Sequence, residues 1–367
     1  MKIASISVFQ HDLRVKNGPY TMSYGEITAL DTTLVKLVTD TGVTGWGETC
    51  PLGPLYAPAH ADGARTALSA LAPGLIGTDV LSGAVMHQMD GLLNGHAYAK
   101  AAIDIAVYDA LGKSVQKPVT DLLGGALRKS VPSYYAIGIE TPDTAARIAR
   151  EKRREGYQRL QLKVGAHSPE VDIEIIHRVG QEIAGSGMRF AVDANRGWTT
   201  RDAIFVSQAC RAIPMIIEQP CKTVSELIAL RPQLAHPLYM DENSVDLDRV
   251  IQAAGAGFVD GFGFKLTRLG GLTPMSTARD ICAARNLPHT VDDAWGGDLL
   301  AAACVHMGAT VRADLFEGTW IAAPYIDGHY DAKSGPRIED GHIAVPEGDG
   351  LGVTPDEGMF GAPVFAT

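Results

Sequence analysis

The chain has 367 residues and a formal net charge of −10, with 46% hydrophobic and 20% charged residues. This composition is ordinary for a globular protein, the length suits a barrel with one added domain, and the acidic balance excludes nucleic acid or an anionic membrane as the expected partner. Five scattered cysteines without a CxxC pair, no membrane-spanning apolar run and no signal peptide predict a cytoplasmic protein without a thiolate metal site.

Residues 1–125 predict a small α+β domain. Period-two alternation predicts strands at Ile3–Leu13 and Thr32–Thr39, and a turn at 41–48 leads into a third strand. A polar loop is expected at 15–26, and prolines and glycine predict a second loop at 51–58.

A helical pattern begins near residue 64 and is clearest over Tyr98–Lys113. The small residues of this segment favour close packing against a neighbour. On it, Asp104 and Asp109 are expected to be solvated or to act as caps.

From residue 126 to residue 321 the pattern alternates between strand and helix, which predicts a parallel sheet, and eight such units predict a closed barrel. The expected strands are Val131–Gly138, Arg159–Val164, Arg189–Asp193, Met215–Glu218, Pro237–Asp241, Phe258–Lys265, His289–Asp292 and Ala313–Glu317. The expected helices between them include Thr144–Glu155, Asp172–Ile183, Thr200–Ala212, Ser225–Leu230 and Leu272–Ala284.

The tail, residues 322–367, is rich in Gly, Pro and Asp and contains one expected strand, Ile338–Val345. It is too poor in apolar pattern to form a core alone. We therefore expect it to pack back on the domain of residues 1–125.

Three carboxylates, Asp193, Glu218 and Asp241, end successive expected strands. The carboxyl ends of parallel strands meet at one mouth of a barrel, where these groups would repel one another unless a cation neutralised them. Ligation by oxygen alone favours Mg²⁺ before Mn²⁺ or Ca²⁺. The alternative is an acidic surface cluster paired with arginine. Neighbouring polar residues are expected to support the site or to cap helices: Asn195, Glu242 and Asn243.

Two lysines, Lys163 and Lys265, end the second and sixth expected strands. These strands lie four apart in a ring of eight, so the two amines face each other across the barrel mouth. A lysine acts as a general base only if its pKa is lowered, and a nearby divalent cation would lower it. The alternative is that each lysine pairs with an acid. Arg268 is expected to support this site rather than to contact a substrate.

Together these residues resemble the enolase superfamily, in its mandelate racemase and muconate-lactonizing branch. The matching segments are Ala106–Asp109, Leu123–Gly125, Lys163, Asp193–Asn195, Glu218–Pro220, Asp241–Glu242, Lys265–Gly271 and Gly350–Val353. The resemblance implies an α+β capping domain over a modified (β/α)₇β barrel, Mg²⁺ on the three carboxylates, and abstraction of the proton α to a substrate carboxylate. It also implies that the loop at 15–26 and the neighbourhood of Tyr56 cover the site.

One position departs from this pattern. Muconate-type members of the family usually carry Lys-x-Lys on the second strand, and here the first position is Gln161. Lys163 matches the catalytic position, so the chemistry is expected to persist, but help in lowering the pKa of Lys163 must come from elsewhere.

Aromatic residues near the expected site predict a pocket for a cation. Tyr56 lies in a capping loop, Trp295 follows the seventh strand and Trp320 follows the eighth. Aromatics at loop ends usually serve packing, yet indole faces are the best cation hosts, and Asp292 adds negative charge nearby. The Asp-x-Asp that dipeptide epimerases of this family carry after strand 8 is absent here.

The sequence therefore predicts a Mg²⁺-dependent epimerase acting at the α-carbon of a cationic cyclic amino acid derivative, such as 4-hydroxyproline betaine or proline betaine. The chain is similar to 4-hydroxyproline betaine 2-epimerases. A lyase, such as a cis-3-hydroxyproline dehydratase or a cycloisomerase, shares the first step and is the alternative. A binding barrel without activity would have lost catalytic groups, whereas all five are present. A homo-oligomer is expected.

Overall fold

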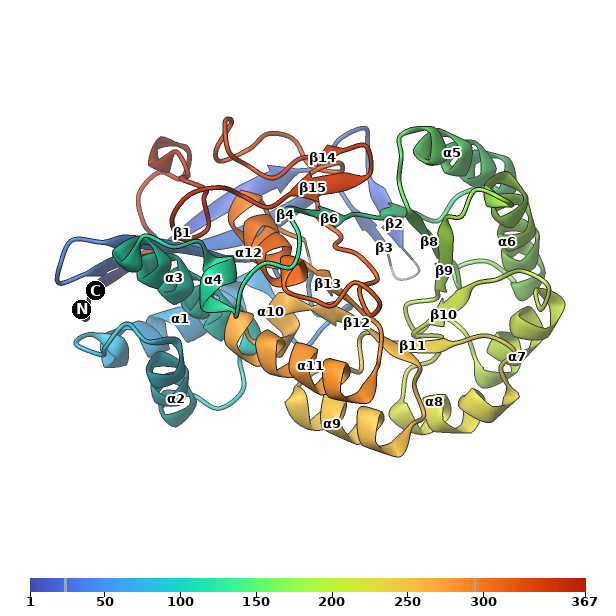
Figure 1. Ribbon diagram of the computed structural model, residues 1–367, viewed down its shortest axis with the longest axis horizontal. Helices are drawn as coiled ribbons and strands as arrows, with labels where there is room; N and C mark the ends of the chain where they lie inside the picture. The colour runs from blue at the N-terminus through green and yellow to red at the C-terminus, as the bar shows by residue number, and fades with distance from the viewer. Residues whose placement is uncertain (23–24, 294) are drawn as a thin grey trace.

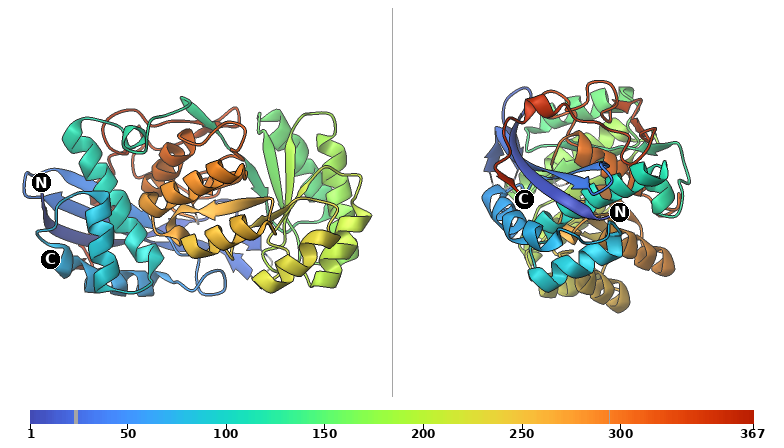
Figure 2. Two further views of the ribbon diagram at one scale, coloured as in Figure 1. Left: turned by 60° about the horizontal axis from the view of Figure 1, so that its bottom comes forward. Right: turned by 90° about the vertical axis from the view of Figure 1, so that its left-hand side faces the viewer.

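The structure, a computed structural model, describes residues 1–22, 25–293 and 295–367. An N-terminal unit of sheet and helices occupies one end of the elongated molecule, and the helices α6 to α8 of a barrel occupy the other (Figures 1 and 2). The two chain termini lie close together on the N-terminal unit.

The N-terminal sheet has the strand order β16–β1–β4–β5. Its strands are β1 (Ile3–Arg14), β4 (Ala29–Thr39), β5 (Thr44–Thr49) and β16 (Phe365–Ala366). β1 and β4 pair antiparallel over their whole length, and the three strands predicted for this region are confirmed.

The loop predicted at residues 15–26 is only partly a loop. It contains the antiparallel strands β2 (Tyr20–Met22) and β3 (Gly25–Ile27), while residues 23 and 24 lie outside the described part of the chain. Three-residue strands carry too few alternating positions for a period of two to show in the sequence.

Two helices, α1 (Ala61–Leu75) and α3 (Ala97–Val115), pack on the N-terminal sheet, while α2 (Ser82–Leu92) packs on both of them and the short α4 (Val119–Leu122) packs on α3 and α12 (Asp298–Ala309). Close packing of α3 on β5 depends on two glycines. A Cβ at Gly45 would lie 2.1 Å from the carbonyl oxygen of Ala106, and one at Gly47 would lie 2.0 Å from that of Ala102. The tight packing predicted for this helix is therefore confirmed.

Of the two alternatives predicted for Asp104 and Asp109, the solvated one is wrong because both are buried, and the cap is confirmed for Asp104. Asp104 accepts hydrogen bonds from the backbone N–H and hydroxyl of Thr273, so it caps a barrel helix from outside that helix. Asp109 accepts from the backbone N–H groups of Trp46 and Leu351, both at 2.8 Å. These contacts join distant segments, which a local sequence pattern does not reveal.

The barrel contains a seven-stranded parallel sheet with its strands in sequence order from β7 to β13. The strands are β7 (Tyr135–Ile137), β8 (Arg159–Lys163), β9 (Arg189–Asp193), β10 (Ile216–Glu218), β11 (Leu238–Met240), β12 (Gly261–Lys265) and β13 (His289–Asp292). The connecting helices are α5 (Pro142–Arg154), α6 (Pro169–Ile183), α7 (Thr200–Ala209), α8 (Val224–Leu230), η1 (Arg231–Gln233), α9 (Leu247–Ala256), α10 (Leu266–Leu269), α11 (Leu272–Arg285) and α12 (Asp298–Ala309). The predicted alternation of strand and helix is confirmed.

The strand predicted at Ala313–Glu317 does not form as a regular strand. The segment instead closes the barrel through single backbone bonds, from Glu317 N–H to the carbonyl of His289 (2.9 Å) and from Thr319 N–H to that of Pro132 (2.9 Å). Gly318, in the left-handed region at φ 112°, interrupts a longer ladder. The first strand predicted for the barrel, Val131–Gly138, is divided into β6 (Ser130–Pro132) and β7.

The C-terminal tail contacts both units. The single strand predicted at Ile338–Val345 is a hairpin of β14 (Ile338–Glu339) and β15 (His342–Ala344), and β15 pairs with β6. Asp340 and Gly341 form its turn with positive φ angles, a signal that Asp-Gly in the sequence already carries. Beyond η2 (Glu357–Met359), Phe360 packs against rings of the N-terminal sheet and β16 joins β1. Among the described residues, no helix is both long and apolar enough to cross a membrane.

Replacing Asp109 by Ala is expected to lower the free energy of unfolding by about 2–5 kcal/mol, because two buried N–H groups lose their acceptor. Asp121, which is exposed and pairs with Lys117 at 3.4 Å, provides the control, and Asp121→Ala should cost less than about 1 kcal/mol. Urea unfolding followed by circular dichroism measures both. Equal losses in the two variants would contradict the role assigned to Asp109.

Candidate active site

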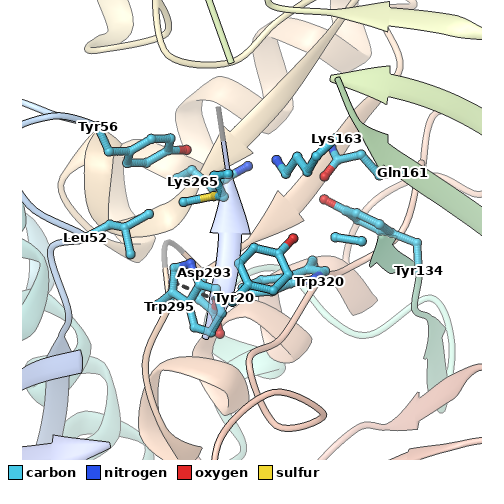
Figure 3. A pocket seen from close by; sticks show the side chains of 12 residues that line it. Tyr20, Leu52, Tyr56, Tyr134, Gln161, Lys163, Lys265, Asp293, Trp295 and Trp320 are labelled. Atoms are coloured by element: carbon cyan, nitrogen blue, oxygen red, sulfur yellow. Dashed lines mark hydrogen bonds between the residues drawn. The ribbon is translucent and has the colours of Figure 1, made fainter. Parts of the chain in front are cut away.

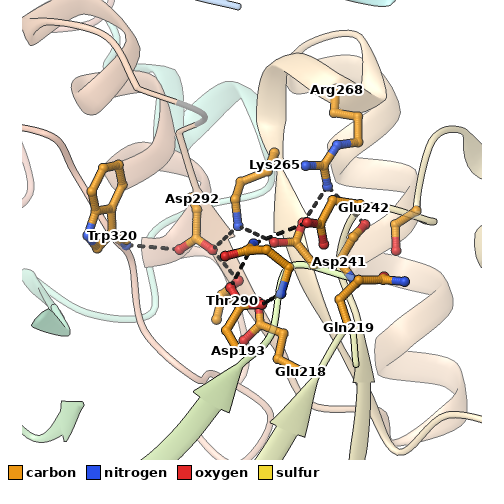
Figure 4. Close-up of polar contacts among 12 residues, drawn as sticks. Asp193, Glu218, Gln219, Asp241, Glu242, Lys265, Arg268, Thr290, Asp292 and Trp320 are labelled. Atoms are coloured by element: carbon orange, nitrogen blue, oxygen red, sulfur yellow. Dashed lines mark hydrogen bonds and ion pairs between the residues drawn. The ribbon is translucent and has the colours of Figure 1, made fainter. Parts of the chain in front are cut away.

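Strand register brings the predicted charged residues to one mouth of the barrel. Lys163 is the register partner of Asp193, and Asp193 is that of Glu218. Lys265 is partnered with Asp292 on the other side, and Asp241 directly follows β11 between them. Figure 4 shows the side chains of Asp193, Glu218, Asp241, Lys265 and Asp292 converging above the strand ends.

The three carboxylates Asp193, Glu218 and Asp241 form one buried cluster, in which one oxygen from each lies within 4.8 Å of the others. Atom Oε1 of Glu218 is buried and makes no hydrogen bond within the described chain. A Cβ at position 263 would lie 2.5 Å from that oxygen, so only glycine leaves the space beside it free. An orphaned carboxylate oxygen in an all-oxygen cluster is the arrangement that a hard divalent cation fits.

Electrostatics within the cluster also point to a missing positive charge. Burial, together with Asp193 and Asp241, raises the pKa of Glu218 to about 8. Burial alone would raise the pKa of Asp241 too, but Lys265 and Arg268 outweigh it and hold that pKa below its usual value. The side chains present thus leave Glu218 without enough compensating charge, and a bound cation would supply it.

The side chains of the two lysines point toward each other in the pocket (Figure 3). Lys163 Nζ lies 2.5 Å from Asp193 Oδ2, and Lys265 Nζ lies 3.1 Å from Asp241 Oδ2. Burial lowers the pKa of each amine, but the adjacent carboxylates outweigh burial and raise both pKa values above the ordinary one. Each lysine is therefore an ammonium group as long as the carboxylates carry their full charge.

The residues expected to support the site lie around the carboxylates. The side-chain amide of Asn195 donates to Asp193 and to Glu242, both at 3.1 Å. Arg268 donates to the carboxylate and the backbone carbonyl of Asp241. Asn243 contacts Gln219, whose side-chain oxygen accepts from the backbone N–H of Asp241, so it lies one step further out.

Gln161, the departure from the family pattern, donates to Glu218 Oε2 at 2.8 Å. Beneath it, the buried guanidinium of Arg159 lies 3.5 Å from the same oxygen and 4.5 Å from the ring centre of Tyr134. These two side chains hold Oε2 and leave Oε1 facing the other carboxylates. Arg159 thus supplies a buried positive charge close to the position where related chains carry a lysine.

The lysines open on a pocket with aromatic walls. Tyr56, Trp295 and Trp320 all line it, as the sequence predicts. Trp295 and Trp320 stand edge to face with ring centres 5.1 Å apart, and Trp295 adopts a left-handed backbone at φ 94°. Strained backbone of this kind concentrates at functional sites.

Among the aromatic lining residues, sequence reasoning missed Tyr20 and Tyr134. Tyr20 lies on β2, and its ring centre is 5.2 Å from that of Trp295. Tyr134 lies in the break between β6 and β7. Tyr20 belongs to the loop expected to cover the site, but nothing in its local sequence shows which of the loop residues points inward.

Asp292 does not line the pocket and instead accepts hydrogen bonds from three other residues of the site. Its Oδ2 accepts from Lys265 (3.2 Å) and from the Tyr134 hydroxyl (2.9 Å), and its Oδ1 accepts from the backbone N–H of Trp320 (2.9 Å). Both oxygens are engaged, and Asp292 lies behind Lys265, outside the pocket lining. Asp292 thus fixes Lys265 and the main chain of Trp320, and its predicted contact with substrate stays a prediction.

Comparison with protein-family models shows the family to which the chain belongs. The model "Enolase C-terminal domain-like" matches residues 143–359, and the model "Mandelate racemase / muconate lactonizing enzyme, N-terminal domain" matches residues 4–124. The chain belongs to the enolase family of these two domains. Its fold, a capping domain with a modified TIM barrel, is the one that the sequence predicted.

Relatives in this enolase family catalyse several reactions. The chain is 39% identical to the cis-3-hydroxy-L-proline dehydratase of Roseibium aggregatum over 99% of both chains. It is 30% identical to the N-succinyl-L-Arg/Lys racemase of Bacillus cereus over 75% of each. A solved enolase-superfamily structure from Roseovarius nubinhibens ISM, complexed with magnesium, is 33% identical with a TM-score of 0.94, covering 100% of this chain and 99% of that one.

The stability of the metal-free protein should fall as pH rises between about pH 5 and pH 8. Glu218, with a folded pKa of about 8 against an ordinary 4.5, keeps a proton that the unfolded chain has lost. A divalent cation binds the ionised form, so the increase in Tm on adding MgCl₂ should be larger at pH 8 than at pH 6. Differential scanning calorimetry measures this increase in Tm, and the Glu218→Gln substitution should abolish the increase. An increase that is independent of pH, or one that survives in Glu218→Gln, would contradict the site.

Proposed function

We propose that this protein is a Mg²⁺-dependent enzyme that removes the proton α to the carboxylate of a small cyclic amino acid derivative with a positively charged nitrogen. The observation that carries the proposal is the pair of lysines facing each other beside a buried carboxylate triad. The magnesium complex of the Roseovarius relative supports the choice of metal.

Asp193, Glu218 and Asp241 would hold the Mg²⁺. When bound, it would stabilise the negative charge that develops on the substrate carboxylate and offset the carboxylate field that now raises both lysine pKa values. Lys163 and Lys265 then approach the α-carbon from opposite faces. The neutral lysine removes the α-proton, and the other, as an ammonium group, returns a proton to the opposite face.

This exchange of one proton for another at one carbon is 2-epimerisation, the reaction that two opposed bases suit best. The pocket walls favour a substrate whose nitrogen carries a fixed charge, because Tyr20, Tyr56, Trp295 and Trp320 present aromatic surface to it. Proline betaine and 4-hydroxyproline betaine have this chemistry. A quaternary nitrogen donates no hydrogen bond, so it needs no carboxylate partner in the pocket.

A second candidate is dehydration of cis-3-hydroxyproline, which the 39% identity to the Roseibium dehydratase supports. The first step is the same. Hydroxide is then lost from the neighbouring carbon, and the second lysine, or the Tyr134 hydroxyl among the pocket-lining groups, would protonate it as it leaves.

Incubation in D₂O distinguishes the two candidates. With MgCl₂ and proline betaine, proton NMR is expected to show loss of the α-proton signal and, with an optically active sample, loss of rotation. EDTA should stop both. With cis-3-hydroxyproline, water loss faster than α-deuteration of the betaine would overturn the epimerase proposal in favour of the dehydratase, and turnover without metal would overturn both.

Each lysine should serve only one configuration at the α-carbon. Lys163→Ala should still exchange the α-proton of one epimer for deuterium while failing to invert it, and Lys265→Ala should do so with the other epimer. Loss of a general base typically costs about 10²–10⁴-fold, so the contrast is large. If each variant loses exchange on both epimers equally, the lysines act as one unit and the opposed-base arrangement is wrong.

A further inference from the structure

The loop that carries Tyr56 forms one wall of the pocket and is folded mainly on itself. The backbone N–H groups of Tyr56 and Ala57 both donate to the carbonyl of Gly53. The neighbouring Leu55 is 70% exposed, whereas the Tyr56 ring is buried and its hydroxyl accepts from Arg268 at 2.5 Å. Those backbone bonds shape the loop but do not attach it to the barrel.

Arg196 attaches it. This residue follows β9, and its guanidinium donates to the backbone carbonyls of both Leu55 and Tyr56, at 3.0 Å each. The contact spans about 140 residues of sequence and crosses from the barrel to the capping loop. It acts on main-chain atoms, so it fixes the position of the loop whatever side chains the loop carries.

The backbone that presents Arg196 is strained. Asn195 and Arg196 both have left-handed backbone, with φ angles of 44° and 70°. Two consecutive non-glycine residues in this region cost free energy that packing must offset, and such strain is typical of functional positions. Here the turn directs the Asn195 amide down to Asp193 and the Arg196 guanidinium up to the capping loop.

Arg196 is also tied to the metal cluster. Its Nε lies 3.7 Å from Glu242 Oε1, the same oxygen that accepts from Asn195. Asn195 in turn donates to Asp193. One chain of contacts therefore runs from the carboxylate triad through Glu242 to the main chain of the Tyr56 loop.

We propose that Arg196 is a positioning residue that fastens the capping loop to the metal site and so sets the Tyr56 ring against the substrate. The part that concerns substrate rests on the function proposed above. The attachment of the loop does not, because its contacts are formed by the protein alone.

The test compares Arg196→Ala, Arg196→Lys and the control Arg201→Ala. Arg201, five residues further on, has a 91% exposed side chain and pairs only with its neighbour Asp202, at 3.6 Å, among the described residues. Hydrogen exchange followed by mass spectrometry on the free enzyme with MgCl₂ should show exchange of the amides of Tyr56 and Ala57 about tenfold faster in Arg196→Ala, since two hydrogen bonds are lost. Arg196→Lys, which keeps a single donor group, should fall between that variant and the wild type.

With proline betaine, KM should rise about tenfold in Arg196→Ala while kcat stays within about threefold, because binding is lost without loss of the bases. The Arg201 variant should match the wild type in both measurements. Unchanged exchange at the loop would overturn the proposal, and faster exchange with an unchanged KM would overturn its substrate part. If the wild type turns over neither candidate substrate, the proposed function fails, while the exchange experiment still decides whether Arg196 holds the loop.

Discussion

The convergence of three buried carboxylates at the ends of adjacent parallel strands is the constraint on which the site depends. Parallel register carries Lys163, Asp193 and Glu218 to neighbouring positions, so their charges cannot avoid one another. Four cationic side chains surround the three carboxylates: those of Lys163, Lys265, Arg268 and Arg159. Glu218 still keeps a raised pKa and an unpaired oxygen. A bound cation would close this balance, and metal binding would then be part of how this barrel mouth is stabilised.

Elsewhere the chain uses buried carboxylates to hold its two units together. Glu48 of β5 accepts from the backbone N–H groups of Gly297 and Leu300 at the start of α12, and from the Tyr330 hydroxyl of the tail. Asp104 and Asp109 act in the same way. Each meets hydrogen-bond donors rather than other acids, and these donors offset part of the burial that raises the pKa of each carboxyl. The same residue type is structural or reactive according to what faces it.

The reaction that follows proton removal depends on the pocket rather than on the triad. Epimerisation and dehydration share the first step, and the metal cluster is suited to both. Under the function proposed above, the two reactions would differ in how the ring nitrogen and its substituents are held, and Tyr20, Tyr56, Trp295 and Trp320, which line the pocket, would hold them. Loops supply all of these except Tyr20, which lies on a three-residue strand, so specificity can change while the barrel chemistry stays constant.

The sequence alone determined the barrel, the triad and the two lysines. Charged residues spaced 25, 23 and 24 residues apart (193 to 218, 218 to 241, 241 to 265) follow apolar runs of strand length, and such a period needs no tertiary information. Only the tertiary structure decided that Asp292 lies behind Lys265, that Tyr20 faces the pocket and that Asp109 is buried. The physical reason is that local patterns record which face of an element is apolar. The partners that a local pattern cannot show include Lys265, 27 residues before Asp292, and Leu351, 242 residues after Asp109, and only the folded chain brings them near.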